Sequence, residues 1–155
     1  MATIVNPNNW HWVEKSCIPW AKQYLTDNLS KVTVEKDDYK ATVTNVGPIT
    51  GDCDITQRKG RVRCLIELAA NFVVKVEKEG GEDSTFDISL PEFEHDQLDE
   101  DYHFQIKNGN PEYKNFLRTY VIPEVLTVFK SFQPDLLEDH RKTLMHNANL
   151  MTVRK

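Results

Sequence analysis

A basic turn between two runs of strand-forming residues constrains this chain more than any other feature of its sequence. Arg58, Lys59 and Gly60 form the turn, and four cations stand within residues 58–63 with no acid among them. Glycine takes positive φ at no steric cost, and the flanking β-branched residues favour strands. The pattern therefore predicts a β-hairpin, and with it an antiparallel sheet, whose tip holds charged side chains in water at a fixed place.

The charge of this turn contrasts with that of the whole chain, which has a formal net charge of −5 over 155 residues. Arginine suits bidentate capture of carboxylates, because its guanidinium group presents a planar fork of donors. A positive turn on an acidic protein therefore indicates a docking feature. The alternative interpretation is a solvated turn that only keeps a sheet edge soluble.

Composition narrows the class of protein. The length and a hydrophobic content of 39% predict one domain with a sizeable core. An acidic balance argues against general nucleic-acid binding, which usually needs an excess of cations. Cys17, Cys53 and Cys64 have no paired spacing, which indicates reduced thiols in the cytosol or nucleus. The N-terminus has no charged lead-in and no long apolar run, so we expect neither a signal peptide nor a membrane span.

The order of predicted elements is a helix, a set of strands and a second helix. Ser16 is expected to cap the first helix, which ends near Leu29 and carries apolar residues at three- and four-residue spacing. Alternating residues then predict an antiparallel meander that ends one of its strands at Pro91. The expected strands lie in residues 31–35, from residue 39 onward, in both arms of the hairpin, and in residues 86–90 and 102–106, with bends at Gly47-Pro48 and Gly51-Asp52.

A long apolar helix is expected to close the fold. Asn110 and Pro111 form a good helix start, with a capping amide before a proline at the first helical position. Pro123 and Pro134 lie inside the apolar pattern, so we expect a kink at the first and a kink or break at the second. The predicted limits are residues 1–145 for a single domain and residues 146–155 for a frayed tail.

A strip of amides and aromatic residues precedes the first helix. Two tryptophans flank a histidine there, and a proline stiffens the backbone before them. Packing of the indole rings into one end of the core would explain the tryptophans but not the amides, which favour a preset recognition strip. The candidate residues of this strip are Asn6, Asn8, Asn9, Trp10, His11 and Trp12.

No catalytic or metal-ligand motif stands out. The five histidines have no metal-ligand spacing to one another or to the cysteines. The sequence has no Gly-rich phosphate loop, no nucleophile elbow and no zinc-protease signature. Residues 52–54 and 92–96 bring carboxylates beside a thiol or a histidine, but turn acids and a solvated acidic edge explain them better. We therefore expect no catalytic residue, no cofactor and no metal, and treat a small enzyme as the least favoured class.

Several of these motifs, taken in order, resemble the N-terminal domain of the activators of heat-shock protein 90 ATPase. They are residues 6–12, the helix with Trp20, Gly51-Asp52, residues 57–60, residues 90–92 and the late helix with Pro123. The resemblance covers nearly the whole chain. It leaves room for one domain only, as in the stand-alone fungal members, although the first domain of a longer activator would look the same.

The resemblance implies an elongated α+β fold with an N-terminal helix, a four-stranded antiparallel meander and a C-terminal helix. It also implies a co-chaperone that binds the middle domain of heat-shock protein 90, modestly stimulates its ATPase and promotes client folding. By resemblance, the docking cations are Arg58, Lys59 and Arg61, with Leu65 as an apolar contact. Residues 6–12 would act later in the cycle, on the nucleotide domains.

The chain departs from the family pattern at the expected interface. Family members often carry lysine where Arg61 stands, and they tend to carry apolar contact residues at the positions of Arg63 and His95. The competing function is a non-enzymatic adaptor whose basic hairpin meets another acidic partner. In either case we expect a monomer in the cytoplasm or nucleus, with no nucleic-acid or membrane partner.

Overall fold

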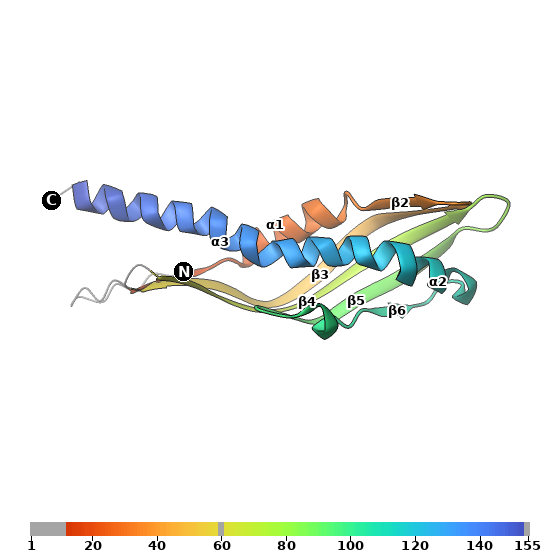
Figure 1. Ribbon diagram of the computed structural model, residues 1–155, viewed down its shortest axis with the longest axis horizontal. Helices are drawn as coiled ribbons and strands as arrows, with labels where there is room; N and C mark the ends of the chain where they lie inside the picture. The colour runs from red at the N-terminus through yellow and green to blue at the C-terminus, as the bar shows by residue number, and fades with distance from the viewer. Residues whose placement is uncertain (1–11, 59–60, 154–155) are drawn as a thin grey trace.

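The computed structural model describes residues 12–58 and 61–153, with side chains for residues 16–57 and 61–140. The chain forms an elongated α+β structure in which one antiparallel sheet carries α1 (Ile18–Leu29) and α3 (Ile122–Val153) on one face (Figure 1). The predicted class and elongated shape are confirmed. The sheet has six strands, two more than the resemblance implied.

Two long strands form the centre of the sheet, and they are the two arms of the predicted hairpin. They pair from one end to the other in antiparallel register, which confirms the hairpin and the meander that follows it. The last strand is shorter than expected and begins at Gln105. The strands are β1 (Trp12–Ser16), β2 (Thr33–Lys36), β3 (Tyr39–Arg58), β4 (Arg61–Lys78), β5 (Ser84–Glu94) and β6 (Gln105–Lys107), in the order β1-β3-β4-β5-β6 with β2 also on β3.

Two prolines occupy bulges in this sheet. The register of β3 shifts between Val46 and Ile49, so the predicted bend at Gly47-Pro48 is confirmed. The prediction that Pro91 ends its strand is wrong, because β5 continues to Glu94. The register of β4 and β5 shifts between Leu68 and Ala70, which leaves the proline in a bulge where no ladder hydrogen bond is required of it.

The other predicted bend, at Gly51-Asp52, keeps its register with β4. Gly51 has a φ of +118°, and a Cβ atom placed on it would collide with the backbone carbonyl oxygen of Glu67. Glycine is therefore required there by two constraints, the left-handed backbone and the close approach of two strands.

The first helix begins one residue later than predicted, after Cys17. Ser16 does not cap it, because that residue ends β1 and pairs with Asp54 of β3. The N–H group of Cys17 donates to the carbonyl oxygen of Cys53 at 2.6 Å, which ties the helix start to the sheet. Strand pairing has thus overridden the local preference of serine for a helix cap.

The start of the C-terminal helical segment is confirmed. The side-chain oxygen of Asn110 accepts from the N–H of Glu112 at 2.9 Å, and Pro111 opens a short 3-10 turn. The predicted irregularity near Pro123 takes the form of a π turn, η3 (Leu117–Val121), which follows α2 (Lys114–Phe116). A wider turn gives room to a proline ring that would otherwise clash with the preceding turn of helix.

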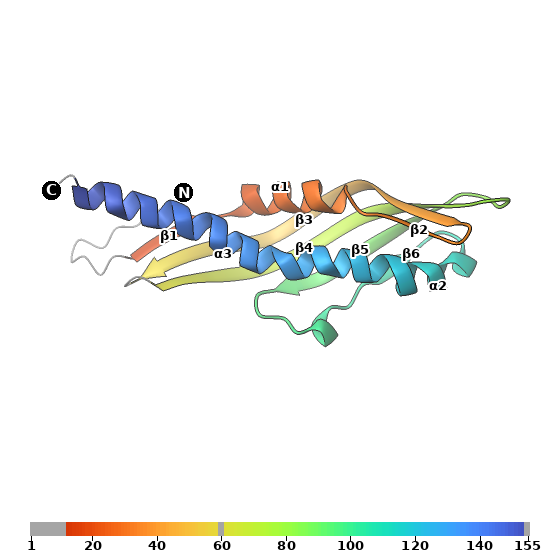
Figure 2. The same cartoon turned by 45° about the horizontal axis from the view of Figure 1, so that its top comes forward.

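α3 then runs through Pro134 without a break, and Figure 2 shows it bending along its course. The break allowed for at this proline is therefore absent. The helix extends to Val153, so the backbone of the expected tail is helical up to that residue. No helix in the described part of the chain is long and apolar enough to cross a membrane.

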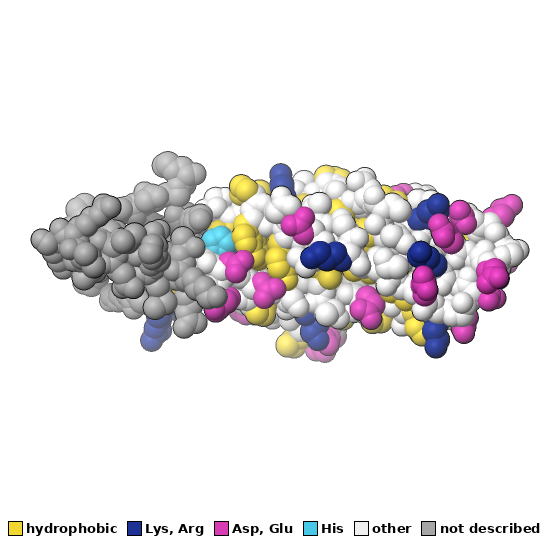
Figure 3. Space-filling view, turned by 90° about the horizontal axis from the view of Figure 1, so that it is seen from above, with side chains coloured by type: hydrophobic (Ala, Val, Ile, Leu, Met, Phe, Trp, Pro, Cys, Tyr) yellow, Lys and Arg dark blue, Asp and Glu magenta, His cyan; other side chains and the backbone are white. Residues whose placement is uncertain are grey.

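The core lies between the sheet and the two helices, and aromatic rings dominate it. Phe93 of β5 packs edge-to-face against Phe129 and Phe132 of α3, with ring centroids 5.0 and 5.1 Å apart. All three rings are buried, and this geometry suits the aromatic quadrupole. The helix-covered side displays acidic and basic side chains interspersed (Figure 3).

The two glycines of β3 provide a test of the close strand approach. Gly51→Ala should lower the free energy of unfolding by about 2 kcal/mol more than Gly47→Ala, because forced overpacking of this kind costs about 1–3 kcal/mol. Gly47 is a matched control, since its φ is +123° and nothing lies within 4 Å of an added Cβ. Urea unfolding of both variants measures the difference. Equal losses of unfolding free energy in the two variants would show that backbone strain alone, without the close strand approach, requires glycine at position 51.

Candidate docking site

The tip of the hairpin lies beyond the end of β5, while β1 runs beside β3 as far as Arg58. Arg58 pairs with Arg61, so residues 59–60 connect the strands, and Figures 1 and 2 show β3 and β4 continuing past the end of β5. Arg61 is exposed, as predicted. Lys59 and the side chain of Arg58 lie outside the described residues.

Side chains alternate strictly along the first residues of β4. Arg61, Arg63 and Leu65 are exposed on the outer face, whereas Val62 and Cys64 are half-buried on the helix side. Leu65 is 39% exposed, so an apolar side chain reaches solvent at the position where the resemblance implies a contact. Successive outward residues of a strand lie on one line, so the structure assembles two guanidinium groups and a leucine into a single row.

The two arginines of this row have no ion-pair partner among the described side chains. Among the described side chains, the ion pairs within 4.0 Å use Lys40, Lys75 and Lys130, and neither Arg61 nor Arg63 takes part. On β3, the half-buried Thr56 pairs with Arg63, and the half-buried Asp54 pairs with Leu65.

A row of carboxylates crosses the same face farther from the tip. Asp52 of β3 pairs with Glu67 of β4, which in turn pairs with Glu94 of β5, and all three are exposed. From the sequence, Asp52 is interpreted as an acid in a turn and Glu94 as an acid on a solvated edge. Their alignment cannot be predicted, because strand register decides which residues become neighbours. The outer face is therefore polarised, positive at the tip and negative behind Leu65. No group of three potential metal ligands in metal-binding geometry is found among the described residues.

His95 lies where β5 leaves β4. The ring Nδ1 atom of His95 accepts from the backbone N–H of Ile66 at 3.2 Å, and the backbone N–H of His95 donates to the carbonyl oxygen of Ile66 at 3.3 Å. The ring therefore closes the ladder at the edge of β4. The resemblance placed a partner contact at this position, and the structure gives the residue a role in the sheet itself.

The three cysteines, distant in sequence, meet beneath the tip. Burial raises the pKa of the Cys53 thiol to about 12, with smaller contributions from Cys17 and Cys64. Burial also raises the pKa of Cys64, helped by the carboxylate of Asp96. Protonated thiols are weak nucleophiles, so the buried Cys53 and the half-buried Cys64 are best explained as packing at the base of the hairpin.

A polar clamp joins the two helices behind the tip. The indole N–H of Trp20 donates to Asp139 Oδ2 at 3.1 Å, and the hydroxyl of Tyr24 donates to Asp135 Oδ2 at 2.6 Å. The two rings stack, with centroids 4.8 Å apart, and Trp20 also meets the buried ring of His140 edge-on. Burial, followed by the hydrogen bond to Asp135, raises the pKa of Tyr24 well above its ordinary value. The clamp fixes α1 on α3.

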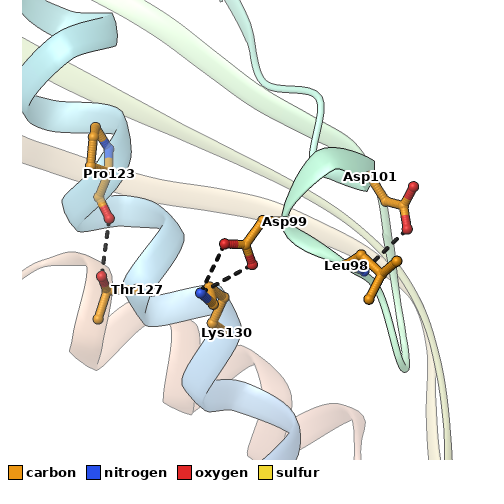
Figure 4. A network of polar contacts seen from close by, with 6 residues as sticks. All are labelled: Leu98, Asp99, Asp101, Pro123, Thr127 and Lys130. Atoms are coloured by element: carbon orange, nitrogen blue, oxygen red, sulfur yellow. Dashed lines mark hydrogen bonds and ion pairs between the residues drawn. The ribbon is translucent and has the colours of Figure 1, made fainter.

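The loop after β5 is fastened to α3 on the other side of the molecule. Lys130 Nζ lies 3.0 and 3.1 Å from the two carboxylate oxygens of Asp99, and Asp101 Oδ2 accepts from the N–H of Leu98 at 3.1 Å (Figure 4). Gln133 adds two hydrogen bonds to Asp96. A cleft of about 360 Å³ lies beneath this loop and is lined mainly by apolar side chains. Leu98, at the top of the loop, is 61% exposed.

The N-terminal strip falls mostly outside the described residues, which include neither Asn6, Asn8, Asn9, Trp10 nor His11. The backbone of Trp12 begins β1 and pairs with Arg58. The end of the strip and the basic turn, which are far apart in the sequence, therefore meet at one end of the sheet.

Comparisons with known proteins agree with this architecture. Residues 14–140 match the family model described as "Activator of Hsp90 ATPase, N-terminal". The chain is 32% identical to the Hsp90 co-chaperone HCH1 of Saccharomyces cerevisiae, covering 91% of this chain and 97% of that protein. It is 36% identical to the Hsp90 co-chaperone AHA1 of the same yeast, covering 88% of this chain but 42% of that protein.

Solved structures show the same fold. The crystal structure of Aha-1 from Plasmodium falciparum superposes with a TM-score of 0.74 at 26% identity, covering 87% of this chain and 93% of that one. The solution structure of the human Aha1 N-terminal domain superposes with a TM-score of 0.54 at 15% identity.

The clamp between the helices predicts a specific response to alkaline pH. Tyr24→Phe should lower the free energy of unfolding by about 1 kcal/mol at pH 7, the usual value of one hydrogen bond. The folded-state pKa of Tyr24 is raised, so its contribution is complete below the unfolded pKa near 10 and is lost as pH rises toward the folded value. The gap between wild type and variant should therefore narrow from pH 8 to pH 11.

Urea unfolding at several pH values measures this gap. Tyr120→Phe is the control, because Tyr120 is 39% exposed and none of the hydrogen bonds of the described residues uses its hydroxyl. A constant gap for Tyr24→Phe across the pH range would contradict the assignment.

Proposed function

The chain belongs to the family of Hsp90 ATPase activators, matching their N-terminal domain, and on this basis we propose that it is an Hsp90 co-chaperone. Two relatives that it matches over most of its length are named Hsp90 co-chaperones. It spans nearly all of one of these relatives and less than half of the other. The family name describes activation of another protein's ATPase, and we assign the chain no ATPase activity of its own.

The observation that carries the docking proposal is the exposed row on β4. Arg61 and Leu65 present a cation and an apolar group on one line next to the basic turn, and no described acid neutralises the cation. We assign this surface, completed by Arg58 and Lys59, to an acidic region of the Hsp90 middle domain. Arg63 lies in the same row and adds a further guanidinium group.

The two motifs at this end of the molecule have different proposed tasks. The basic turn docks, and residues 6–12 act afterwards on the nucleotide domains. The pairing of Trp12 with Arg58 supports such a division, because it holds the last residue of the strip at the docking end of the sheet. The chain would in this way contact two domains of its partner.

Activation follows from a shift in population. Hsp90 hydrolyses ATP slowly because a middle-domain arginine has to reach the γ-phosphate held by another domain. A co-chaperone that binds the competent arrangement more tightly raises its fraction, by no more than its differential affinity for the two arrangements. We propose that the chain acts as a monomer and stimulates the ATPase modestly, because a domain of this kind acting without a tethered partner domain lacks the effective concentration that tethering supplies.

An adaptor for a different acidic protein is the competing function. As an adaptor the chain would also bind through the basic turn, and its partner would be another acidic protein of the cytoplasm or nucleus. Affinity capture from cytosol with and without ATP separates the two. Hsp90 as the main, ATP-sensitive prey supports the co-chaperone, and its absence supports the adaptor.

Reversal of the turn charges should abolish most of the binding. Arg58→Glu/Lys59→Glu should weaken affinity for Hsp90 at least 100-fold, because close charged contacts are worth roughly 2–5 kcal/mol each on truncation. Wild-type affinity should also fall with added salt. Lys22→Glu/Lys107→Glu, with two exposed lysines on α1 and β6, makes the same change in net charge away from the tip. Calorimetric titration compares the variants, and equal losses for both pairs would reduce the effect to net charge.

Changes in the strip should separate activation from binding. Asn8→Ala/Asn9→Ala/His11→Ala should leave affinity for Hsp90 within about threefold of wild type and lower the stimulation of its steady-state ATPase. Thermal unfolding of the variant is the control. Loss of affinity, stimulation and cooperative unfolding together would instead assign the strip to the core.

A further inference from the structure

One edge of β4 is open beside the proposed docking row. The pairing of β4 with β5 begins at Glu67, and His95 extends it to Ile66. Toward the tip, residues 61–65 of β4 pair with β3 and with no other strand of the described chain. Figures 1 and 2 show this end of β4 running on past β5.

The direction of the backbone groups on this edge follows from Ile66. Its N–H and its carbonyl oxygen both bond to His95, on the β5 side of the strand. Backbone groups of an antiparallel strand alternate in direction with every residue. Cys64 and Val62, two and four residues away, therefore direct their N–H and carbonyl groups to that same side, where no described strand meets them. Such an edge is a template for one more strand.

The side chains along the edge define what that strand would contain. Arg61, Arg63 and Leu65 point to the outer face, and Val62 and Cys64 are only half-buried on the helix side. Residues paired across strands lie on the same face of the sheet. The outward side chains of a strand added to β4 would therefore lie opposite Arg61 and Arg63. Its inward side chains would lie beside Val62 and Cys64.

We propose that an extended segment of the partner, with acidic residues alternating with apolar ones, adds to the open edge of β4 as a further strand. The inference rests on the proposed function and specifies the form of the docking contact. Main-chain hydrogen bonds at Val62 and Cys64 supply affinity, while carboxylates opposite Arg61 and Arg63 supply specificity. His95 occupies the edge at Ile66, so the added strand spans residues 61–65, roughly 16 Å at the usual rise per residue.

Charge selects this occupant over a second copy of the chain. Two copies joined through the same edge in antiparallel register would set Arg61 and Arg63 of one against the same arginines of the other. Like charges directly opposite in a sheet are destabilising. The arginines thus disfavour self-association and favour an acidic strand.

The test removes one outward N–H group and keeps the β3–β4 ladder. Val62→Pro deletes a donor that faces the open edge, a position where proline is tolerated, and Val62→Ala is the matched control that keeps the donor. We expect the proline variant to bind Hsp90 at least tenfold more weakly than wild type, and the alanine variant to remain within about threefold. Equal affinities for the two variants, with unchanged thermal unfolding, would overturn the proposal.

Hydrogen exchange on the wild-type chain decides the matter without relying on a variant that folds. The amides of Val62 and Cys64 should exchange freely in the isolated chain and at least tenfold more slowly in the complex. Those of Arg61 and Arg63, which face β3, should change little. Binding without new protection at Val62 and Cys64 would overturn strand addition and leave the co-chaperone function intact. A wild-type chain that does not bind Hsp90 would overturn the proposed function itself, and protection that grows with its own concentration would identify a second copy as the occupant.

Discussion

The continuous pairing of β3 with β4 is the interaction on which the rest of the structure depends. β1 and β2 pair with opposite ends of β3, β5 pairs with part of β4, and β6 pairs in turn with β5. The ladder continues past the end of β5 and satisfies the backbone groups that β3 and β4 direct at each other. It can therefore carry a charged turn away from the helices and still hold it in one place.

The helices make this hairpin rigid at its base. Phenylalanine rings of α3 cover the sheet, and the pairs Trp20–Asp139 and Tyr24–Asp135 lock α1 against α3. The crowded glycine at position 51 of β3 and the bulge at Pro91 of β5 lie on opposite sides of β4, next to Leu68. Rigid placement matters for a docking surface, because side chains that are already ordered lose less freedom when the partner binds.

The outer face joins these features to recognition. Cations at the tip, Leu65 behind them and the row of Asp52, Glu67 and Glu94 farther along give the face a polarity that a partner can match in one orientation only. Electrostatic complementarity of this kind contributes more to specificity and to the rate of association than to affinity. The open edge of β4 adds a main-chain contact beside the same row.

The sequence by itself determined the features that depend on local chemistry. Alternation and helical spacing predicted the hairpin, the meander and both helices, Asn110 and Pro111 marked the second helix start, and the charges around Gly60 marked the tip. Tertiary structure decided the rest, because strand register and long-range pairing have no local signal. It made Ser16 the end of a strand, placed Pro91 inside one, brought the cysteines together, and aligned Glu67 with two carboxylates from other strands. It also left one edge of β4 unpaired, since only the point at which β5 leaves the sheet determines where that edge begins.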